Sequence, residues 1–396
     1  MTSVLTVITR LEGGAGALAL RGILGLDRAL FEPVIVTGSG GRLLEQAADH
    51  GVEVIVSPVL KPTIDPLCDL RAVRWLAAVI AGRRPDVVHT HCAKAGTIGR
   101  LAARRAGTRR IVHTYHGFPF HEFQSAVRRR AYVEVERRLG RLTDVGLCVG
   151  TGVAVEAIRR GLISPERVRT IGVPVDAGQH PAGRVGRHPA DVARARRRLG
   201  IADGDLIVGA VGRLTYQKAP EEFVAAMRAL GRPDVVGVWV GGGERAAATA
   251  RLASAAGQRL LLCGDRSDVA DLLPAFDVFA LTSRYEGLPT AIAEAMASSV
   301  PVVATAVNAV ADLVEPGVTG LLVPPARPDL MASAVGYLLD SPAEAARMAT
   351  AARSRIGARY GLPALRAALE AAYCPGMNLA GFDSCEPRCS RLLDTT

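Results

Sequence analysis

Two glutamates in the stretch SRYEGLPTAIAEAMA have the residue type and spacing that most clearly suggest chemistry. Glu286 and Glu294 stand eight positions apart, across a proline and a run of alanines. Pro289 suits the first turn of a helix because it has no amide hydrogen to lose there. Glu286 is therefore expected in the loop before a helix, and Glu294 on its second turn among small apolar residues. A carboxylate in such surroundings needs a partner, since burying it alone costs a large amount of free energy.

Two cations follow an apolar run earlier in the chain, in VGRLTYQKAP. Arg213 can bind two phosphate oxygens with its guanidinium, and Lys218 adds a point charge. The expected helix after Glu286 would present free amides to the same space, those of Gly287, Leu288 and Thr290. A carboxylate can in addition accept hydrogen bonds from a ribose diol. The set predicts a site for a nucleotide diphosphate attached to a sugar; solvated cations and a structural ion pair for Glu294 are the alternative.

A glycine cluster follows the first apolar run, in RLEGGAGALAL. Backbone amides at the start of a helix can bind an anion, and Gly14 lies at such a start. Gly14, Gly16 and Ala19 also fit a dinucleotide-binding fingerprint loosely. That fingerprint needs an acid at the end of the second strand, and VIVTGSG has none. We expect the backbone amides of this cluster to contact an anion, with a plain tight turn as the alternative.

Histidines gather at the ends of two apolar runs of the first half. DVVHTH contains His89 and His91, and HTYHGFPFHEF contains His113, His116 and His121. His116 directly follows the expected strand, which favours a position at a ligand site. A satisfied structural histidine is the alternative for each of them. A role for His89 and His91 near a second substrate is an open hypothesis.

The elements that must position these residues follow one pattern. Short apolar runs alternate with helical stretches along the 396 residues, which is typical of parallel sheets covered by helices on both faces. We expect a doubly wound domain over residues 1–171, a Gly- and Pro-rich linker over 172–192, and a second doubly wound domain over 193–373. Ligands bind outside the carboxyl ends of strands in such sheets, so the cleft between the domains should hold the site.

The last segment, 374–396, loses this periodicity and is expected to be irregular. It contains three cysteines, and a zinc site is the alternative, although no histidine accompanies them.

The composition limits partners and location. Lys and Arg outnumber Asp and Glu by 48 to 38, which favours anionic partners. Acids interrupt the basic runs and aromatics make up only 4%, which argues against nucleic acid. The sequence has no apolar run long enough to span a membrane and no signal peptide, and its seven cysteines are mostly far apart, so a cytoplasmic location is expected. Aromatics before a basic helix, over 118–141, leave open a peripheral contact with anionic membrane.

The sequence resembles the GT-B glycosyltransferases of the retaining family 4, also called glycosyl transferases group 1. The resemblance extends in order to about Tyr373, and the spacing of Glu286 and Glu294 is its most specific feature. The matching segments are EGGAGALAL, DVVHTHCAKAGTIGRLAA, HTYHGFPFHEF, VGRLTYQKAP, LLCGDRSDVADLLPAFDVFALTSRYEGLPTAIAEAMA, PVVAT and GVTGLLVPP.

The resemblance implies a nucleotide-sugar donor held mainly by the second domain and an acceptor held mainly by the first. Arg213 and Lys218 would stabilise the leaving diphosphate, Glu294 would bind the nucleotide ribose, and Glu286 would lie near the transferred sugar. The implied catalytic residues are His116, Arg213, Lys218 and Glu286. The implied donor-binding residues are Gly14, Arg213, Lys218, Glu286, Gly287, Leu288 and Glu294. No metal and no cofactor are implied.

The expected function is retaining, metal-independent transfer of a hexose or amino-hexose to an acceptor hydroxyl. UDP is the expected nucleotide, with GDP as the alternative. The acceptor is either a soluble natural product, such as an aminocyclitol antibiotic precursor of a GC-rich bacterium, or a lipid-linked saccharide or polysaccharide. The sequence favours the soluble acceptor, because no strongly amphipathic anchor stands out. A nucleotide-sugar 2-epimerase and a non-catalytic sugar-nucleotide-binding protein are the alternative functions.

The chain departs from the family pattern at a few positions. Ala219, Ser299 and the pair Asn308-Ala309 stand where glycine is usual, and Asp312 stands where glutamate is usual. The last of these lie near the expected donor site, so the identity of the sugar stays open.

Overall fold

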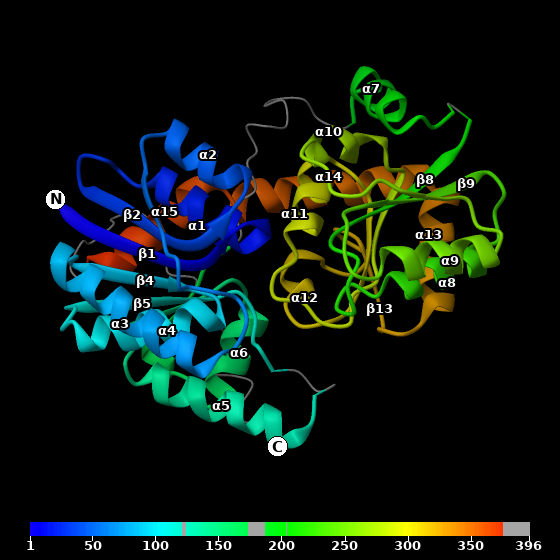
Figure 1. Cartoon of the computed structure of the whole chain (residues 1–396). Helices are drawn as coiled ribbons and strands as arrows, with labels where there is room; N and C mark the ends of the chain where they lie inside the picture. Colours follow the sequence, from blue (N-terminus) through cyan, green and yellow to red (C-terminus); the bar gives the residue numbers. More distant parts are fainter. Residues whose placement is uncertain (121–123, 173–186, 203, 375–396) are drawn as a thin grey trace, which may run out of the picture.

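The structure is a computed structural model that describes residues 1–120, 124–172, 187–202 and 204–374. Two α/β domains lie side by side, each with a central parallel sheet and helices on both faces (Figure 1). The first sheet has the strand order β3-β2-β1-β4-β5-β6-β7, and the second has the order β10-β9-β8-β11-β12-β13. The predicted fold class, two doubly wound domains, is therefore confirmed.

The first domain is built from seven strands, of which the sequence pattern predicted six. Its strands are β1 (Thr2–Leu11), β2 (Phe31–Gly40), β3 (Glu53–Val56), β4 (Val87–His91), β5 (Arg110–Tyr115), β6 (Val145–Cys148) and β7 (Val168–Thr170). Its helices are α1 (Gly13–Gly25), α2 (Arg42–Asp49), α3 (Pro66–Arg83), α4 (Ala93–Arg105), α5 (Ala126–Gly140) and α6 (Thr151–Arg159), followed by a 3-10 turn at Pro165–Arg167. The additional strand, β7, is a three-residue edge strand without an apolar run, so the pattern did not indicate it.

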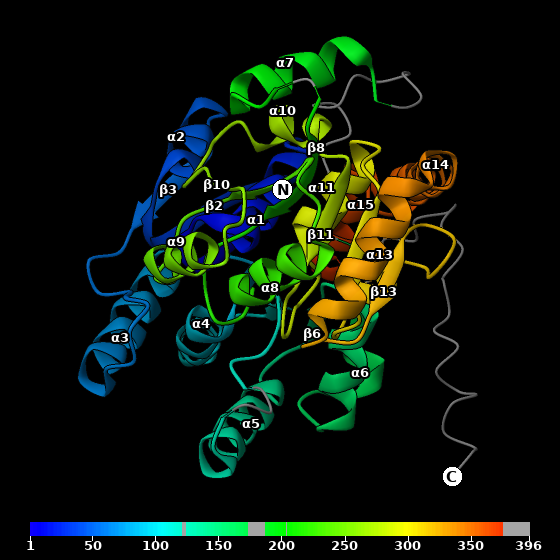
Figure 2. The ribbon, with the colours of Figure 1, turned by 90° about the vertical axis from the view of Figure 1, so that its right-hand side faces the viewer.

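The second domain repeats the alternation. Its strands are β8 (Leu206–Val211), β9 (Val235–Val240), β10 (Leu260–Leu262), β11 (Val278–Leu281), β12 (Val302–Thr305) and β13 (Leu321–Val323). Helices of this half are α7 (Pro189–Leu199), α8 (Pro220–Leu230), α9 (Ala246–Ala255), α10 (Val269–Leu272), α11 (Thr290–Ala297), α12 (Val310–Leu313), α13 (Pro328–Asp340) and α14 (Pro342–Arg359), with a 3-10 turn at Leu273–Ala275. Figure 2 shows α8 and α13 side by side on one face of this sheet. Central strands such as β11 are apolar and fully buried, as expected for strands covered on both faces.

The last described helix, α15 (Leu362–Tyr373), differs from the predicted domain limits. We expected it in the second domain, but it packs on α1 and β5 of the first (Figure 1). The Tyr373 hydroxyl lies 2.7 Å from His89 Nδ1, and Leu369 lies against Gly22 of α1. Helix α14 packs against α11 of the second domain. The chain then crosses back to the first domain, where α15 buries its apolar face.

Two predicted segments fall largely outside the described residues. Of the linker, 172–192, residues 173–186 lie outside, and its end from Pro189 is the first turn of α7. Of the segment 374–396, only Cys374 lies within the described part of the chain, with its Sγ 3.7 Å from Thr2 Oγ1. Among the helices that the structure describes, none has the length and apolar character needed to cross a bilayer.

Candidate active site

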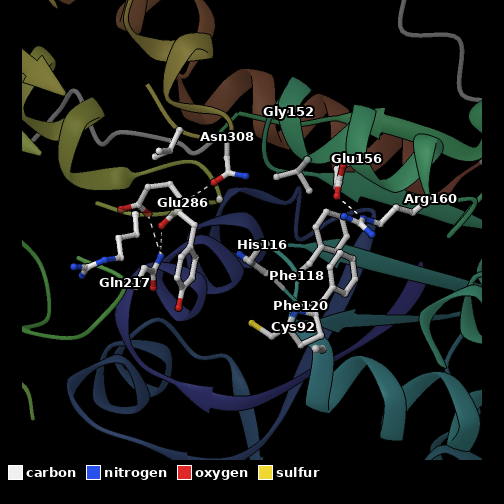
Figure 3. Close-up of a pocket in the computed structure, with 18 of the residues that line it drawn as sticks. Cys92, His116, Phe118, Phe120, Gly152, Glu156, Arg160, Gln217, Glu286 and Asn308 are labelled. Carbon is white, nitrogen blue, oxygen red and sulfur yellow. Dashed lines mark hydrogen bonds and ion pairs between the residues drawn. The ribbon is translucent and has the colours of Figure 1, made fainter. Parts of the chain in front are cut away.

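The two domains enclose a cleft of about 710 Å³ at the carboxyl ends of their strands (Figure 3). This volume falls within the range of roughly 300–1,000 Å³ that is usual for small-molecule sites. The first domain contributes the loops after β4 and β5 and the helix α6. The second domain contributes the loops after β8, β11 and β12. Its lining includes Cys92, His116, Phe118, Phe120, Gly152, Glu156, Arg160, Gln217, Glu286, Gly287 and Asn308.

Glu286 lies in the loop between β11 and α11, with its side chain almost fully buried. Its Oε1 lies 2.6 Å from Lys218 Nζ and accepts a hydrogen bond of 2.5 Å from Ser283 Oγ. Gln217 Nε2 donates to Oε2 at 3.3 Å, as Figure 3 shows. The structure thus brings Glu286 and Lys218 into direct contact, which the sequence did not predict. Ser283 and Gln217 were not predicted either, and only their places beside Glu286 and Lys218 could have suggested them.

Arg213 lies in the loop after β8, and its side chain is exposed. Within the described residues it forms no ion pair or hydrogen bond, and its charge lowers the pKa of Tyr285 against the larger, opposite effect of burial. Because Tyr285 lines the cleft, the guanidinium is close enough to the cleft to meet an anionic ligand. Neither Arg213 nor Lys218 itself lines the cavity, and Lys218 is connected to it through Glu286.

Glu294 is partly buried on α11, as predicted, and like Arg213 and Lys218 it does not itself line the cavity. Burial raises its pKa, and the charge of Arg21 on α1 of the first domain partly offsets this effect. No group among the described residues donates a hydrogen bond to this carboxylate or pairs with it. The charge of Arg21 nevertheless acts on this carboxylate, so the alternative of a structural ion pair stays open.

The N-termini of α1 and α11 approach each other across the domain boundary. A Cβ added at Gly14 would lie 3.4 Å from Thr290 Oγ1, so the two helix starts nearly touch. Helix α11 begins at Thr290, one residue later than predicted, with Pro289 as its N-cap. The amides of Gly287, Leu288 and Thr290 have no backbone acceptor among the described residues, and the Leu288 side chain is buried. Two positive helix ends thus face one space, which suits an anion.

The histidines separate into two groups. His116 follows β5 at the cleft, and its Nε2 lies 3.0 Å from Nδ1 of His91 at the end of β4. Burial lowers the pKa of His116 to about 4, so the imidazole is neutral at physiological pH. His89 contacts Thr114 as well as Tyr373, and His113 contacts Thr90, so both are satisfied core residues. The proposed role of His89 near a second substrate is therefore not supported; His121 lies outside the described residues.

Glycine is required where the loop after β11 meets the loop after β5. A Cβ added at Gly287 would lie only 1.9 Å from the carbonyl oxygen of His116. No side chain fits there without moving one domain away from the other. This contact sets Glu286 and His116 on opposite walls of the same cleft (Figure 3).

At three of the departures from the family pattern the backbone is left-handed, which explains why glycine is usual there. Ala219, Ser299 and Asn308 have φ angles of 50°, 56° and 45°, which favour glycine. Each therefore stands at a position whose conformation the family's usual glycine adopts without strain. Asp312, which stands where glutamate is usual, accepts a hydrogen bond of 2.5 Å from the Thr151 amide at the start of α6, and so joins the two domains.

The first-domain wall is aromatic and basic. The Phe118 and Phe120 rings are stacked with centroids 4.8 Å apart, and the Arg160 guanidinium lies 5.0 Å from the Phe120 ring. Glu156 forms ion pairs with both Arg159 and Arg160. Nothing in the sequence marked these α6 residues, because they lie on an ordinary mixed-charge helix. An apolar platform beside arginines can bind the ring face and the anionic groups of a second ligand.

The sequence contains an Asp-x-Asp pattern at residues 203–205, of which residue 203 lies outside the described part of the chain. Asp205 forms an ion pair of 2.6 Å with Arg259, at the opposite end of the second sheet from the cleft. The described residues contain no group of three or more His, Cys, Asp or Glu side chains placed to hold a metal ion.

Both halves of the chain match models of known protein families. Residues 12–179 match the family model Glycosyltransferase Family 4, and residues 191–355 match Glycosyl transferases group 1. The chain is 31% identical over 329 residues to the GDP-mannose-dependent alpha-(1-6)-phosphatidylinositol monomannoside mannosyltransferase of Mycolicibacterium smegmatis, covering 78% of this chain and 80% of the relative. It is 29% identical over 306 residues to the UDP-Gal:alpha-D-GlcNAc-diphosphoundecaprenol alpha-1,3-galactosyltransferase of Escherichia coli, covering 75% and 77%.

The fold has solved counterparts. The structure of Anabaena Alr3699/HepE in complex with UDP and glucose superposes with a TM-score of 0.81 at 22% identity, covering 93% of this chain and 98% of that one.

Proposed function

The chain belongs to the glycosyl transferases group 1 family and has the GT-B fold, and on this premise we propose that it is a retaining enzyme that uses a UDP-sugar. The acceptor would be the hydroxyl of a lipid-linked saccharide. The single observation that supports the donor assignment best is the state of Glu294. Burial raises the pKa of its carboxylate against the opposite effect of Arg21, no hydrogen-bond donor among the described residues meets it, and it lies on the helix whose start approaches the start of α1. A ribose diol would supply the missing donors, and the adjoining diphosphate would meet the helix amides.

The proposed reaction breaks the bond between the anomeric carbon and the donor's phosphate oxygen and forms a bond from that carbon to the acceptor oxygen. The acceptor proton passes to the departing phosphate oxygen, which leaves as free UDP. Arg213, Lys218 and the α11 amides would stabilise the charge that develops on the diphosphate, usually the largest catalytic contribution. Glu286 is already bound by Lys218, Ser283 and Gln217, which disfavours it as a nucleophile for double displacement. Attack from the same face, with retention, is therefore proposed, and it requires no metal.

The lipid-linked acceptor is proposed from relatives and from the surface beside the cleft. The two relatives named above act, by their names, on a diphosphoundecaprenol saccharide and on a phosphatidylinositol mannoside. Helix α5 begins at Ala126 near the aromatic wall, and its first turn contains Val127, which is 79% exposed, followed by Arg128, Arg129 and Arg130. Such a helix start suits the anionic surface of a membrane, and we propose a cytoplasmic enzyme that meets its acceptor there.

A donor panel tests this proposal. Purified protein is heated with UDP, GDP, UDP-glucose, UDP-galactose, UDP-GlcNAc and GDP-mannose in turn. UDP at 100 times its Kd should stabilise the fold by about 2.7 kcal/mol and raise Tm, because it binds only the folded state. A shift with GDP alone would correct the nucleotide, and no shift with any nucleotide would contradict the proposed function.

Product analysis tests the finer points. With the best donor and a lipid-linked saccharide, the product's anomeric configuration, measured by NMR, should equal that of the donor. Inversion would contradict the mechanism.

Transfer should persist in EDTA, and its loss would contradict metal independence. Transfer to a soluble aminocyclitol but not to the lipid-linked acceptor would replace the proposed acceptor.

A further inference from the structure

Asn308 stands at the cleft in a left-handed backbone conformation. It lies in the loop between β12 and α12 with φ at 45°, where glycine is the least strained residue. Among residues with a side chain, asparagine tolerates this region best. The side chain is exposed into the cleft that it lines (Figure 3).

The two ends of the Asn308 amide have different surroundings. Its Oδ1 accepts a hydrogen bond of 2.9 Å from the backbone amide of Glu286. Because that partner is a donor, the group bonded to it must be the oxygen, and this settles the orientation of the side-chain amide. The Nδ2 group is therefore directed away from Glu286, as Figure 3 shows, and no acceptor among the described residues meets it.

The neighbouring first-domain helix leaves this group free. A Cβ added at Gly152 of α6 would lie 3.1 Å from the Asn308 carbonyl carbon and 3.2 Å from its oxygen. The first domain thus packs on the backbone of Asn308, and its side chain remains in the cleft. This end of the cleft then presents the Glu286 carboxylate as an acceptor and Asn308 Nδ2 as a donor, with the neutral His116 on the facing wall.

We propose that Asn308 determines which sugar is transferred: Oδ1 holds the Glu286 loop while Nδ2 donates a hydrogen bond to an oxygen substituent of the sugar. This inference rests on the proposed function, since the sugar is that of the proposed donor. A site that hydrogen-bonds one sugar oxygen discriminates strongly against analogues that lack it, because its polar group is then left unpaired. The same loop with glycine would lack this donor.

The test compares Asn308→Asp with Asn308→Gly and the wild type. Aspartate keeps an oxygen for the Glu286 amide and tolerates the left-handed backbone, but it replaces the donating NH2 with an accepting oxygen. Glycine removes both contacts. Each protein is assayed for UDP affinity, and for kcat/KM with the best nucleotide sugar of the donor panel and with its monodeoxy analogues.

Asn308→Asp should lower kcat/KM for the best donor by about 10- to 100-fold. UDP affinity, which involves no sugar, should change by less than about 3-fold. One deoxy analogue should be poor for the wild type, yet no worse than the parent donor for Asn308→Asp. This result isolates a contact between Asn308 and one sugar oxygen.

Unchanged donor ranking in Asn308→Asp would overturn the inference. Equal losses for every donor and for UDP would overturn it as well, since Asn308 would then act only by holding the Glu286 loop. Failure of the proposed function looks different: the wild type itself would bind neither UDP nor GDP and would use no donor, before any variant is considered.

Discussion

Lys218 and Glu286 form an ion pair at the site. Their side chains are 17% and 5% exposed, so the 2.6 Å contact is largely shielded from water. Ser283 and Gln217 complete the set of partners and hold the carboxylate in one orientation. Charges fixed in this way need not reorganise during a reaction, which is what electrostatic catalysis requires.

Arg213 should contribute to turnover more than to binding, because charge on the diphosphate increases as the bond to the sugar breaks. Arg213→Ala should lower kcat by about 10²- to 10³-fold with a smaller change in donor KM. Steady-state kinetics with the best donor measure this effect. Arg251→Ala, on the exposed side of α9, is the matched control and should keep wild-type kinetics. A variant of Arg213 that loses affinity but not kcat would assign the residue to binding alone.

His116 should act as a neutral group throughout the physiological range. Its pKa is lowered to about 4 by burial, so it stays unprotonated as pH falls through the ordinary histidine value of about 6.5. The profile of kcat/KM, which reports the free enzyme, should show no His116 step between pH 5.5 and 8.5. A step near pH 6.5 that disappears in His116→Asn would contradict the burial of this imidazole.

At the residue scale, the types of the site residues could be predicted from the sequence, but the contacts between them could not. Arg213, Glu286 and Glu294 could be selected because their types suit a diphosphate sugar. The contact of Lys218 with Glu286 could not be predicted, because it joins loops 68 residues apart whose distance depends on the packing of β8 beside β11. The wall made by Glu156 and Arg160 was missed for the same reason.

At the scale of elements, the C-terminus of α11 is strained. Ser299 follows the helix with φ at 56°, and its amide donates to the Met296 carbonyl at 3.0 Å, an arrangement that usually employs glycine. Its buried hydroxyl oxygen also lacks a hydrogen-bond partner among the described residues. The helix that bears Glu294 therefore ends on an unfavourable residue.

Ser299→Gly should stabilise the protein by about 1–2 kcal/mol, because it removes both the left-handed strain and the unpaired hydroxyl. Thermal unfolding measures the change. The neighbouring Ser298 is the matched control: its φ is −82°, and its hydroxyl donates to the Glu294 carbonyl at 2.8 Å. Ser298→Gly should therefore destabilise. A loss of stability in both variants would show that the strain at Ser299 is negligible.

The pattern of elements was largely predictable, with instructive exceptions. Runs such as VFALTS are apolar because their strands are covered on both faces. The alternation of strands and helices could therefore be predicted from the sequence. The edge strand β7 has no such run. Helix α15 has an ordinary amphipathic sequence, and only tertiary packing on α1 and β5 decides to which domain it belongs.

A second element-scale feature is the buried ion pair that joins α4 to α5. Arg100 lies 2.8 Å from Glu136, and the two side chains are 0% and 4% exposed. Glu136→Gln should cost about 3–5 kcal/mol, since it leaves a buried guanidinium without a counter-charge. Glu134→Gln on the same helix should cost less than about 1 kcal/mol, because that residue pairs with Arg138 on the surface. Similar unfolding free energies for the two variants would contradict the burial of the pair.

The whole molecule brings two sheets together so that their carboxyl ends share one cleft. Contacts across the boundary include Gly287 with His116, the Thr151 amide with Asp312, and the start of α1 with Thr290. The chain also crosses back to the first domain, where helix α15 packs on α1 and β5. The apolar core is continuous between the domains.

The most direct test of the central claim is calorimetric titration of UDP into wild-type protein and Glu294→Gln, with Glu344→Gln on α14 as a control. We predict that Glu294→Gln weakens UDP binding by about 10- to 100-fold, because an ionised acceptor of two ribose hydroxyls is lost. Since the pKa of Glu294 is raised, wild-type affinity should fall as pH drops through that raised value, and the affinity of the variant should not. Equal UDP affinity in wild type and Glu294→Gln would contradict the assignment of Glu294 to the ribose of the donor.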